Sequence, residues 1–279
     1  MLRSALNIRS NSQAFAELLL LLTRHKLLTF ELARREIMDR YAGQFFGIFW
    51  TFVHPLVVIL VYVFLFSTVF TTKVGGSIQM PLDMTSYILA GIIPWLAFSE
   101  SMSKGSTAIT NNANLVKQVI FPIEVLPVKG VIATLFTEII FLSMQTVYTL
   151  IKYQGLSPMY LLLPLALTLQ VLAMIGVSYI LSAVGAYLRD TKDFIQVFLA
   201  IGFWFVPILY LPQAIPASIR PLLLVNPFSH LIWCFQDILY FGRFEHPWSW
   251  LIYAVLSLIV FLYGYRLFRK LKVMFGDVL

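Results

Sequence analysis

The sequence predicts an all-α integral membrane protein with six transmembrane helices. Three features of its composition support this fold class. Hydrophobic residues make up 59% of the 279 residues, only 12% are charged, and the mean hydropathy is +0.84. Soluble globular chains carry about 25% charged residues. This chain therefore has too few charges to cover the exterior of a water-soluble fold of its length.

Residues 1–46 are predicted to form a cytoplasmic and interfacial segment with an amphipathic helix. A helix over residues 13–23 would place four large apolar side chains on one face: Phe15, Leu18, Leu19 and Leu22. This pattern is typical of a helix that lies along the inner membrane surface. The alternative is a short soluble helix that packs on a partner.

The transmembrane domain is predicted to cover residues 47–265, because a membrane-crossing helix needs about 20 mostly apolar residues. The six expected spans are residues 47–70, 85–102, 130–151, 158–188, 194–210 and 248–265. The second span is the weakest, since it contains Pro94 and reaches Glu100. Residues 266–279 form a basic tail.

The distribution of basic residues predicts the orientation of these spans. Sixteen Lys and Arg residues fall in the N-terminal segment, in the connections after the second and fourth spans, and in the tail, whereas four fall in the other connections. Cytoplasmic segments are enriched in Lys and Arg, so both termini are expected in the cytoplasm. The same rule explains residues 34–40, where five charged side chains precede a run of 32 uncharged residues.

The connection over residues 101–130 is predicted to carry a short amphipathic helix on the cytoplasmic face. Asparagines at 111, 112 and 114 can cap its start, and Pro122 and Pro127 are expected to end it. It is either an ordinary interfacial loop or a docking element for a cytoplasmic partner.

The connection over residues 211–247 contains five prolines but is too apolar for a solvated loop. Short re-entrant helices that dip into the membrane from outside would bury this surface, with Asn226 and Pro227 as the turn. Lipid cannot satisfy irregular backbone, so such a segment must be covered by protein or water. We therefore expect it to lie beside a conduit.

Two polar side chains fall within the expected spans. Glu138 should face other helices or water, because a carboxyl group facing lipid is costly. A structural hydrogen bond across a helix pair is favoured over a proton-coupling role. His54 precedes Pro55 and is expected to satisfy polar groups near a kink, and the sequence offers it no companion metal ligand.

Enzyme signatures and a basic nucleic-acid-binding face are both missing from the sequence. It has no G-x-x-x-x-G-K-[ST] phosphate loop, no G-x-G-x-x-G, no H-E-x-x-H and no G-x-S-x-G. We expect no catalytic residue, metal site or cofactor in this chain. The basic residues lie at the edges of apolar runs rather than on one face, so no nucleic-acid partner is expected. If this protein moves a substrate uphill, the energy must come from a partner or an ion gradient.

Four stretches together resemble a known family. Residues 40–55 read R-Y-x-G-x-x-x-G-I-x-W-x-x-x-x-P, and residues 114–127 read N-L-V-K-Q-V-I-F-P-I-E-V-L-P. Residues 187–190 are Y-L-R-D, and residues 225–228 are V-N-P-F. In this order they resemble the membrane subunit of type-2 ABC exporters, which move polysaccharides such as O-antigen, capsule and teichoic acid across the bacterial inner membrane. The F-P-x-E-x-L-P stretch is the most specific part, and His54 departs from what the family often has.

The resemblance implies a homodimer with two separate ATPase subunits, which bind ATP and Mg, docked on the cytoplasmic side. It implies that the connection between spans two and three is the coupling helix. The implied ATPase contacts are Leu115, Val116, Lys117, Phe121, Pro122 and Glu124. The cargo would be a lipid-linked glycan that passes through the dimer. Aromatic residues from spans near that interface are the candidates for the translocation path: Tyr62, Phe66, Trp204 and Tyr210.

Three other functions stay open at this point. The chain could be a type-2 ABC exporter of a drug or another small hydrophobic molecule. It could be an ion-coupled secondary transporter that uses Glu138. It could also be a membrane-embedded assembly protein without a transport role.

Overall fold

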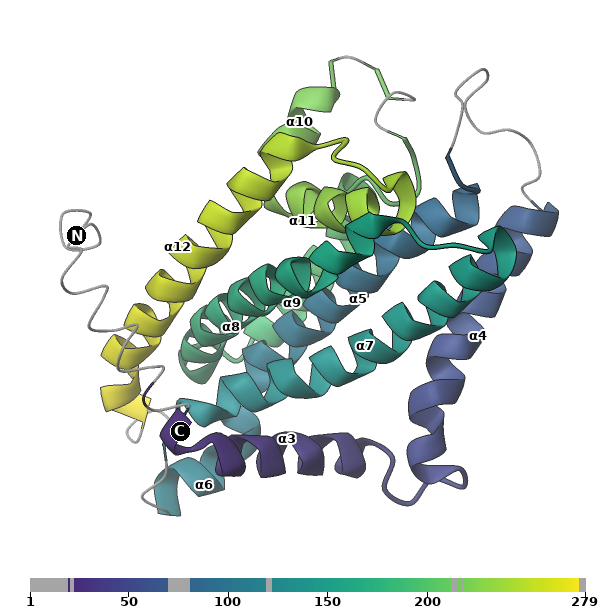
Figure 1. The fold of residues 1–279 in the computed structure, drawn as a ribbon. Coiled ribbons are helices and arrows are strands. Elements are labelled where there is room, and N and C mark those ends of the chain that lie inside the picture. The colour runs from purple at the N-terminus through teal and green to yellow at the C-terminus, as the bar shows by residue number, and fades with distance from the viewer. Residues whose placement is uncertain are drawn as a thin grey trace.

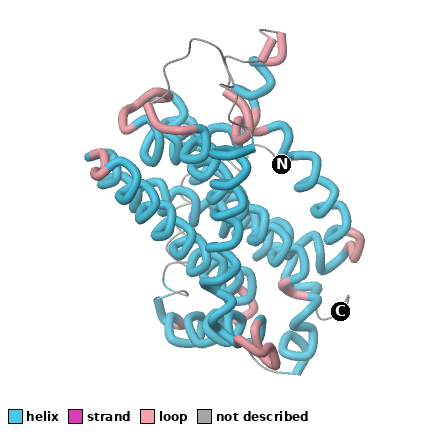
Figure 2. The backbone as a smooth tube through the Cα atoms, turned by 90° about the vertical axis from the view of Figure 1, so that its right-hand side faces the viewer, coloured by secondary structure: helices cyan, strands magenta, loops and turns pink. Residues whose placement is uncertain are grey.

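The structure is a computed structural model that describes residues 20, 23–69, 81–118, 122–211, 215–216 and 218–275. These residues form helices and connecting loops, and Figure 2 shows no strand among them. The amphipathic helix expected over residues 13–23 lies almost wholly outside the described part of the chain.

The described residues of the N-terminal half form four α-helices and several short helical turns. Its elements are α3 (Lys26–Arg40), the 3-10 helix η1 (Gly47–Phe49), α4 (Trp50–Phe64), the π-helical turn η2 (Leu65–Val69), α5 (Met84–Thr107), the 3-10 helix η3 (Thr110–Asn112) and α6 (Ala113–Gln118).

The C-terminal half holds the longest helices. Its elements are α7 (Val125–Tyr153), the 3-10 helix η4 (Pro158–Leu162), α8 (Leu163–Tyr187), α9 (Thr191–Gly202), the 3-10 helix η5 (Phe203–Phe205), α10 (Arg220–Val225), α11 (Pro227–Gln236), the π-helical turn η7 (Asp237–Phe241), α12 (Pro247–Leu271) and the 3-10 helix η8 (Lys272–Met274).

Four helical stretches of the described chain are long and apolar enough to cross a membrane. They are Gly47–Phe64, Val125–Tyr153, Pro158–Tyr187 and Pro247–Met274. They match the first, third, fourth and sixth expected spans. The expected all-α membrane fold is thus present, while the count of six spans stays a prediction.

The other two expected spans, residues 85–102 and 194–210, form helices that depart from a simple crossing. α5 runs for 24 residues but contains Pro94 and carries charged side chains in its second half. α9 and η5 start and end earlier than expected, and together they rise only about 24 Å. That length is less than the hydrocarbon core of about 30 Å, so the chain beyond η5 must contribute to any crossing here.

Pro127, in the connection after α5, acts differently from the expectation. Pro127 lies inside the first turn of α7 rather than ending a helix, and α7 begins at Val125. Proline is tolerated in the first turn because the backbone N–H that it lacks would have no partner there.

The helices are arranged around α8, which packs against α12, α5 and α7. In Figure 1, α5, α7, α8 and α12 run side by side, and α4 stands at the edge of this bundle. α11 is inserted between α5, α12 and α8, and its residues from Ser229 to Gln236 are buried. The tilted bundle therefore has its core along α8 and leaves much of α4 uncovered.

Close contacts between helix backbones hold the centre of this bundle. A Cβ added to Gly176 of α8 would lie 2.5 Å from the carbonyl oxygen of Val260 on α12. A Cβ on Gly264 would meet the backbone of Gly176, and one on Gly185 would meet the carbonyl oxygen of Ser106. Small residues allow membrane helices to approach this closely and gain van der Waals contact.

α3 lies crosswise at one end of the bundle, where α6 also lies (Figure 1). Thr29 and Ala33 of α3 are buried, and the helix packs on α7. η8 reaches the same end, because Lys272 contacts Glu124 just before α7. This end of the molecule is called the α6 end below, and the described parts near both termini meet there.

Candidate functional site

The α6 hairpin, residues 113–124, is the segment to which sequence analysis assigned the ATPase contacts. Leu115 is 37% exposed and Lys117 is also exposed, so both present surface at the α6 end. Val116 is partly buried against the core, and Pro122 is half-buried. Phe121 lies outside the described residues.

Glu124, the last residue of this hairpin, is buried inside the molecule. Only 4% of the residue is exposed, and its carboxylate forms an ion pair with Lys272 of η8. Its backbone carbonyl accepts a hydrogen bond of 2.9 Å from the hydroxyl of Tyr179 on α8. Glu124 therefore has little surface to offer a partner and instead ties the start of α7 to α8 and η8.

Ion pairs join α3 to α5 and α7 beside the hairpin. The carboxylate of Glu36 on α3 lies 3.2 Å from Nζ of Lys104 on α5 and 3.6 Å from Nζ of Lys129 on α7. Lys129 also donates a hydrogen bond of 3.3 Å to the side-chain oxygen of Asn112, just before α6. Two polar contacts of Lys129 thus connect the residue before α6 to α3.

The network continues toward the end of α3 that leads to α4. Lys104 lies 3.0 Å from Glu100, one turn earlier on α5, and Glu100 also pairs with Arg40 at the end of α3. Burial lowers the pKa of Lys104, and the nearby carboxylate of Glu36 opposes part of this shift. These partly buried charges are desolvated, so removing one leaves its partners uncompensated.

A second candidate site is an apolar groove on α9, which we call the α9 groove. Ile195 on one face of α9 is buried against the bundle, whereas the opposite face is open. The groove has a volume of about 570 Å³ and lies between α9 and the α10–α11 turn. It is lined by Phe194, Val197, Phe198, Ile201, Gly202, Phe205, Leu222, Val225, Asn226, Pro227 and Phe228.

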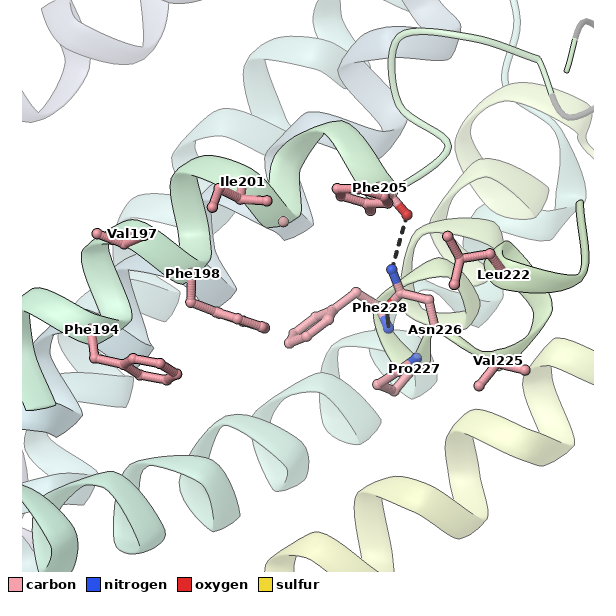
Figure 3. A pocket seen from close by; sticks show the side chains of 11 residues that line it. Phe194, Val197, Phe198, Ile201, Phe205, Leu222, Val225, Asn226, Pro227 and Phe228 are labelled. Carbon is pink, nitrogen blue, oxygen red and sulfur yellow. Dashed lines mark hydrogen bonds between the residues drawn. The ribbon is translucent and has the colours of Figure 1, made fainter. Parts of the chain in front are cut away.

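The two walls of the α9 groove are joined by aromatic and polar contacts (Figure 3). The rings of Phe198 and Phe228 point toward one another with centroids 6.2 Å apart. Asn226 donates a hydrogen bond of 2.9 Å to the carbonyl of Phe205, and its side-chain oxygen accepts one of 3.0 Å from the backbone of Phe228. One asparagine thus caps α11 and holds the end of η5.

The four aromatic residues assigned to a translocation path occupy two places. Tyr62 and Phe66 are stacked with centroids 6.4 Å apart and are half-buried against the core. Trp204 is 65% exposed beside the α9 groove. Tyr210 donates its hydroxyl to the carbonyl of Trp204 at 3.1 Å. Their role along one path stays a prediction.

The two intramembrane polar residues lie within the bundle. Glu138 is only 2% exposed, and Gln170 of α8 is a polar neighbour. Within the described chain, neither carboxyl oxygen of Glu138 reaches a partner at hydrogen-bond distance and geometry. The ring of His54 contacts Phe141 edge-on, with centroids 6.4 Å apart. The described residues contain no cluster of His, Cys, Asp and Glu that could hold a metal.

Asp83 organises the opposite end of the bundle. Its carboxylate accepts hydrogen bonds from Lys152 at 2.7 Å, Tyr153 at 2.8 Å and Tyr148 at 3.0 Å, all on α7. It also caps α5 by accepting one from the backbone of Ser86. Burial by itself would raise the pKa of Asp83, but the hydrogen bonds outweigh it and hold the pKa well below its usual value.

A comparison with protein families shows to which family this chain belongs. The profile of the family described as ABC-2 type transporter matches residues 28–240, from the start of α3 into η7. The chain belongs to the ABC-2 type transporter family. This membership and the four long apolar helices make the ABC-2 chain a multi-pass membrane protein of a transporter, and they imply partnership with an ABC ATPase subunit.

Curated relatives of this ABC-2 chain carry a common name. The chain is 28% identical over 258 residues to the O-antigen export system permease protein RfbA of Myxococcus xanthus. The aligned region covers 92% of this chain and 96% of that protein. The chain is 25% identical over 252 residues to each of two proteins of the same name from Klebsiella pneumoniae, with 89% of this chain and 93% of each relative covered.

Sequence reasoning about this ABC-2 chain missed two sets of candidate residues. The α3 network of Glu36, Lys104 and Lys129 joins residues far apart in the sequence, and only the spacing of Glu100 and Lys104 by one helical turn hinted at it. The α9 groove was also missed, although Phe194, Phe198 and Phe205 recur at helical spacing.

Proposed function

We propose that this chain is the transmembrane subunit of an ATP-driven exporter that moves a lipid-linked polysaccharide across the bacterial inner membrane. The observation that carries this proposal is the similarity, over 92% of the chain, to a protein named as an O-antigen export permease. Such near-complete coverage includes the hairpin and the re-entrant region as well as the long helices. The same similarity favours a polysaccharide over a drug as the cargo.

The proposed subunit has six spans, formed by α4 with η2, α5, α7, η4 with α8, α9 with the chain that follows it, and α12. An even number of spans is supported by the meeting of the described parts near both termini at the α6 end. The excess of Lys and Arg in the segments at this end supports a cytoplasmic position for it.

In the proposed mechanism, two copies of this chain form a homodimer and two ATPase subunits dock on their α6 hairpins. ATP and Mg bind in the partner subunits and draw them together. Leu115 and Lys117 are the exposed side chains that would receive this movement. The contacts of Lys129 and Glu36 would pass it to α3 and, through Arg40, toward α4.

The α9 groove is the proposed place where the second copy and the glycan meet this chain. Its open face is almost wholly apolar, which within a membrane suits either lipid or another protein surface. Aromatic rings such as Trp204 can contact the faces of sugars without fixing the polymer in one position. A passage at the interface would therefore allow a glycan to slide.

Docking of the ATPase at the α6 hairpin can be tested with two leucines of similar exposure at opposite ends of the bundle. Leu115→Glu should reduce the amount of ATPase that co-purifies with the chain and the export of polysaccharide. Leu156, which is 40% exposed beyond α7, is the matched control, and Leu156→Glu should leave both unchanged. Normal ATPase recovery with Leu115→Glu would refute the docking assignment.

The orientation can be tested by cysteine labelling, because the native Cys234 is buried and can be replaced by alanine. In that background, Lys117→Cys should resist an impermeant maleimide in intact cells, and Arg243→Cys should react. The reverse pattern would overturn the proposed topology.

The cargo can be identified by purifying the chain with its ATPase and analysing bound lipid by mass spectrometry. We expect a lipid-linked glycan, and cells lacking the chain should retain that glycan inside. Loss of drug resistance with unchanged surface polysaccharide would instead identify a drug exporter.

A further inference from the structure

Glu124 has a buried carboxylate to which the proposed mechanism gives no role. The residue belongs to the F-P-x-E-x-L-P stretch and lies between the α6 hairpin and α7. Although Glu124 is the N-cap residue of α7, its side chain makes no capping hydrogen bond within the described chain. The carboxylate instead pairs with Nζ of Lys272, which lies 148 residues further along the chain. This side chain therefore serves a contact between distant segments.

The segment that carries Lys272 is anchored to the bundle by other contacts as well. The hydroxyl of Tyr187, the last residue of α8, donates a hydrogen bond of 2.9 Å to the carbonyl of Leu271. Phe275 is fully buried, and its ring centroid lies 6.0 Å from that of Tyr187. η8 and its flanking residues are thus held against α8 without Glu124. Loss of the ion pair should therefore leave η8 in place.

The two ends of the α6 hairpin are connected to different helices. Just before the hairpin, Asn112 accepts a hydrogen bond from Lys129, which also pairs with Glu36 of α3. At the other end, Glu124 pairs with Lys272 at the end of α12. The hairpin therefore has a second polar connection to the bundle, which leads from Glu124 to α12.

α12 links the α6 end of the molecule to the opposite end, where α10 lies (Figure 1). In its first turn, Oγ of Ser249 lies 3.1 Å from Nδ1 of His230 on α11. α11 also carries Phe228, which lines the α9 groove. Rigid helices and packed side chains can carry coupling between distant sites. α12 is therefore a continuous connection from Glu124 to the helix that forms one wall of the groove.

We propose that Glu124 is a positioning residue for coupling, which passes movement of the α6 hairpin to α12 through its ion pair with Lys272 and does not touch the ATPase. We call this pair the Glu124–Lys272 clasp. Two largely desolvated charges suit this task, because they fix the relative position of two segments and neither charge is compensated without the other. The inference rests on the proposed function, in which an ATPase docks on the hairpin.

Charge removal and charge exchange test the clasp in the complex of the full chain with its ATPase. Glu124→Gln and Lys272→Gln should each keep ATPase recovery and ATP hydrolysis near the wild-type level. Each should lower export, measured as surface polysaccharide in cells that lack the native chain, by about fivefold or more, which is the lower end of the usual coupling between two sites. The exchanged pair, Glu124→Lys with Lys272→Glu, should restore most of this loss. Lys270→Gln is the matched control, since Lys270 is an exposed lysine near the same end of α12.

Hydrogen exchange in α11 gives a second readout that does not depend on the cargo. In the wild-type complex, ATP should change the exchange of α11. This change should become smaller in the Glu124→Gln complex and should return in the exchanged pair. An ion pair that only stabilises the fold would instead lower the unfolding temperature and leave the response of α11 to ATP unchanged.

Failure of the clasp and failure of the proposed function give different results. If the wild type recovers no ATPase or shows no response to ATP, the proposed function fails and the clasp fails with it. If the wild type responds to ATP but exports no polysaccharide, the cargo assignment fails, and hydrogen exchange still decides the clasp.

Three results for the variants would overturn the clasp alone. The first is a wild-type response of α11 and wild-type export in both single variants. The second is loss of the ATPase from a folded Glu124→Gln protein, which would make Glu124 an ATPase contact. The third is loss of export that the exchanged pair does not restore. Unfolding of both single variants would likewise make the pair structural, and Lys272→Gln decides the question if Glu124→Gln alone fails to fold.

Discussion

Asp83 and Glu138 are both largely buried carboxyl groups, but their surroundings differ. Asp83 lies at the end of the bundle opposite α6 and accepts hydrogen bonds from a lysine, two tyrosines and a helix start. Glu138 lies within α7, and its oxygens have no hydrogen-bond partner in the described chain. The first arrangement stabilises a charged group, and the second favours a neutral one.

Asp83→Asn should destabilise the protein by about 1–3 kcal/mol at neutral pH, because charge-assisted hydrogen bonds to Lys152, Tyr148 and Tyr153 are weakened. The pKa of Asp83 is lowered in the folded state. Its stabilisation is therefore present above the ordinary aspartate pKa of about 3.9 and is lost as the pH falls below that value.

Thermal unfolding in detergent between pH 7 and pH 3 measures this effect. Between pH 7 and pH 3, the wild type should lose more stability than Asp83→Asn, because only the wild type has the Asp83 carboxylate to protonate. Asp39→Asn is the control, because Asp39 forms an exposed pair with Arg35 that contributes little. Equal stability of the Asp83 variant and the wild type at pH 7 would contradict the prediction.

Glu138→Gln should keep about half or more of the export rate and should unfold at the wild-type temperature or above it, because a neutral amide of similar shape avoids the cost of a buried charge. Export assays and thermal unfolding measure the two quantities. Loss of export from a folded Glu138→Gln protein would favour an ion-coupled mechanism.

Two elements, α9 and α3, differ most from regular spans. α9 buries one face on the bundle and leaves the other open, and the carbonyls of η5 at its end accept hydrogen bonds from Asn226 and Tyr210. α3 lies across the α6 end and is held by ion pairs rather than by a strongly apolar face. Both are therefore fastened through a few polar contacts, which suits elements that move during transport.

Variants of Asn226 can separate its two hydrogen bonds, one with the carbonyl of Phe205 and one with the backbone N–H of Phe228. Asn226→Asp keeps the oxygen that caps α11 but cannot donate to the carbonyl of Phe205, whereas Asn226→Ala loses both. The alanine variant should lose about 0.5–2 kcal/mol of stability through the missing cap. The aspartate variant should stay closer to the wild type in stability.

Thermal unfolding and hydrogen exchange in α11 and η5 distinguish the two variants. We expect faster exchange in η5 for both and in α11 for the alanine variant alone. Unchanged exchange in η5 for both variants would show that Asn226 does not hold the end of this helix.

The whole bundle depends on close packing around α8, which touches α12 and α5 through glycines on its two sides. Gly176 and Gly264 bring α8 and α12 together, and Gly185 brings α8 against α5 at Ser106. In a membrane, lipid tails are as apolar as the helix surfaces, so such packing contributes much of the association energy.

Gly176→Ala should destabilise the protein by about 1–3 kcal/mol or more, because the added methyl group would overlap the backbone of α12 and force the two helices apart. Gly155→Ala is the matched control, since nothing lies within 4 Å of a Cβ at that position. Thermal unfolding of the two variants in detergent tests this difference. Equal unfolding temperatures would contradict the packing described here.

Local patterns in the sequence were sufficient to predict several elements. The apolar runs of α7, α8 and α12 mark helices at nearly their observed positions, because transfer into lipid depends on composition along the chain. The turn at Asn226 and Pro227 was also predicted correctly, because proline starts a helix well and asparagine caps it. α7 begins five residues before the expected span 130–151, because a proline is tolerated in the first turn of a helix.

By itself, the sequence determined the membrane class, the long helices and the charge bias from which their orientation is predicted, because each of these follows from neighbouring residues. Only the tertiary structure decided the pairing of Glu36 with Lys104, the burial of Glu124, the open face of α9 and the backbone contact of Gly176 with α12. These features join residues that are distant along the chain. Their energies depend on how the helices cross, and no local pattern of hydropathy or charge encodes that angle.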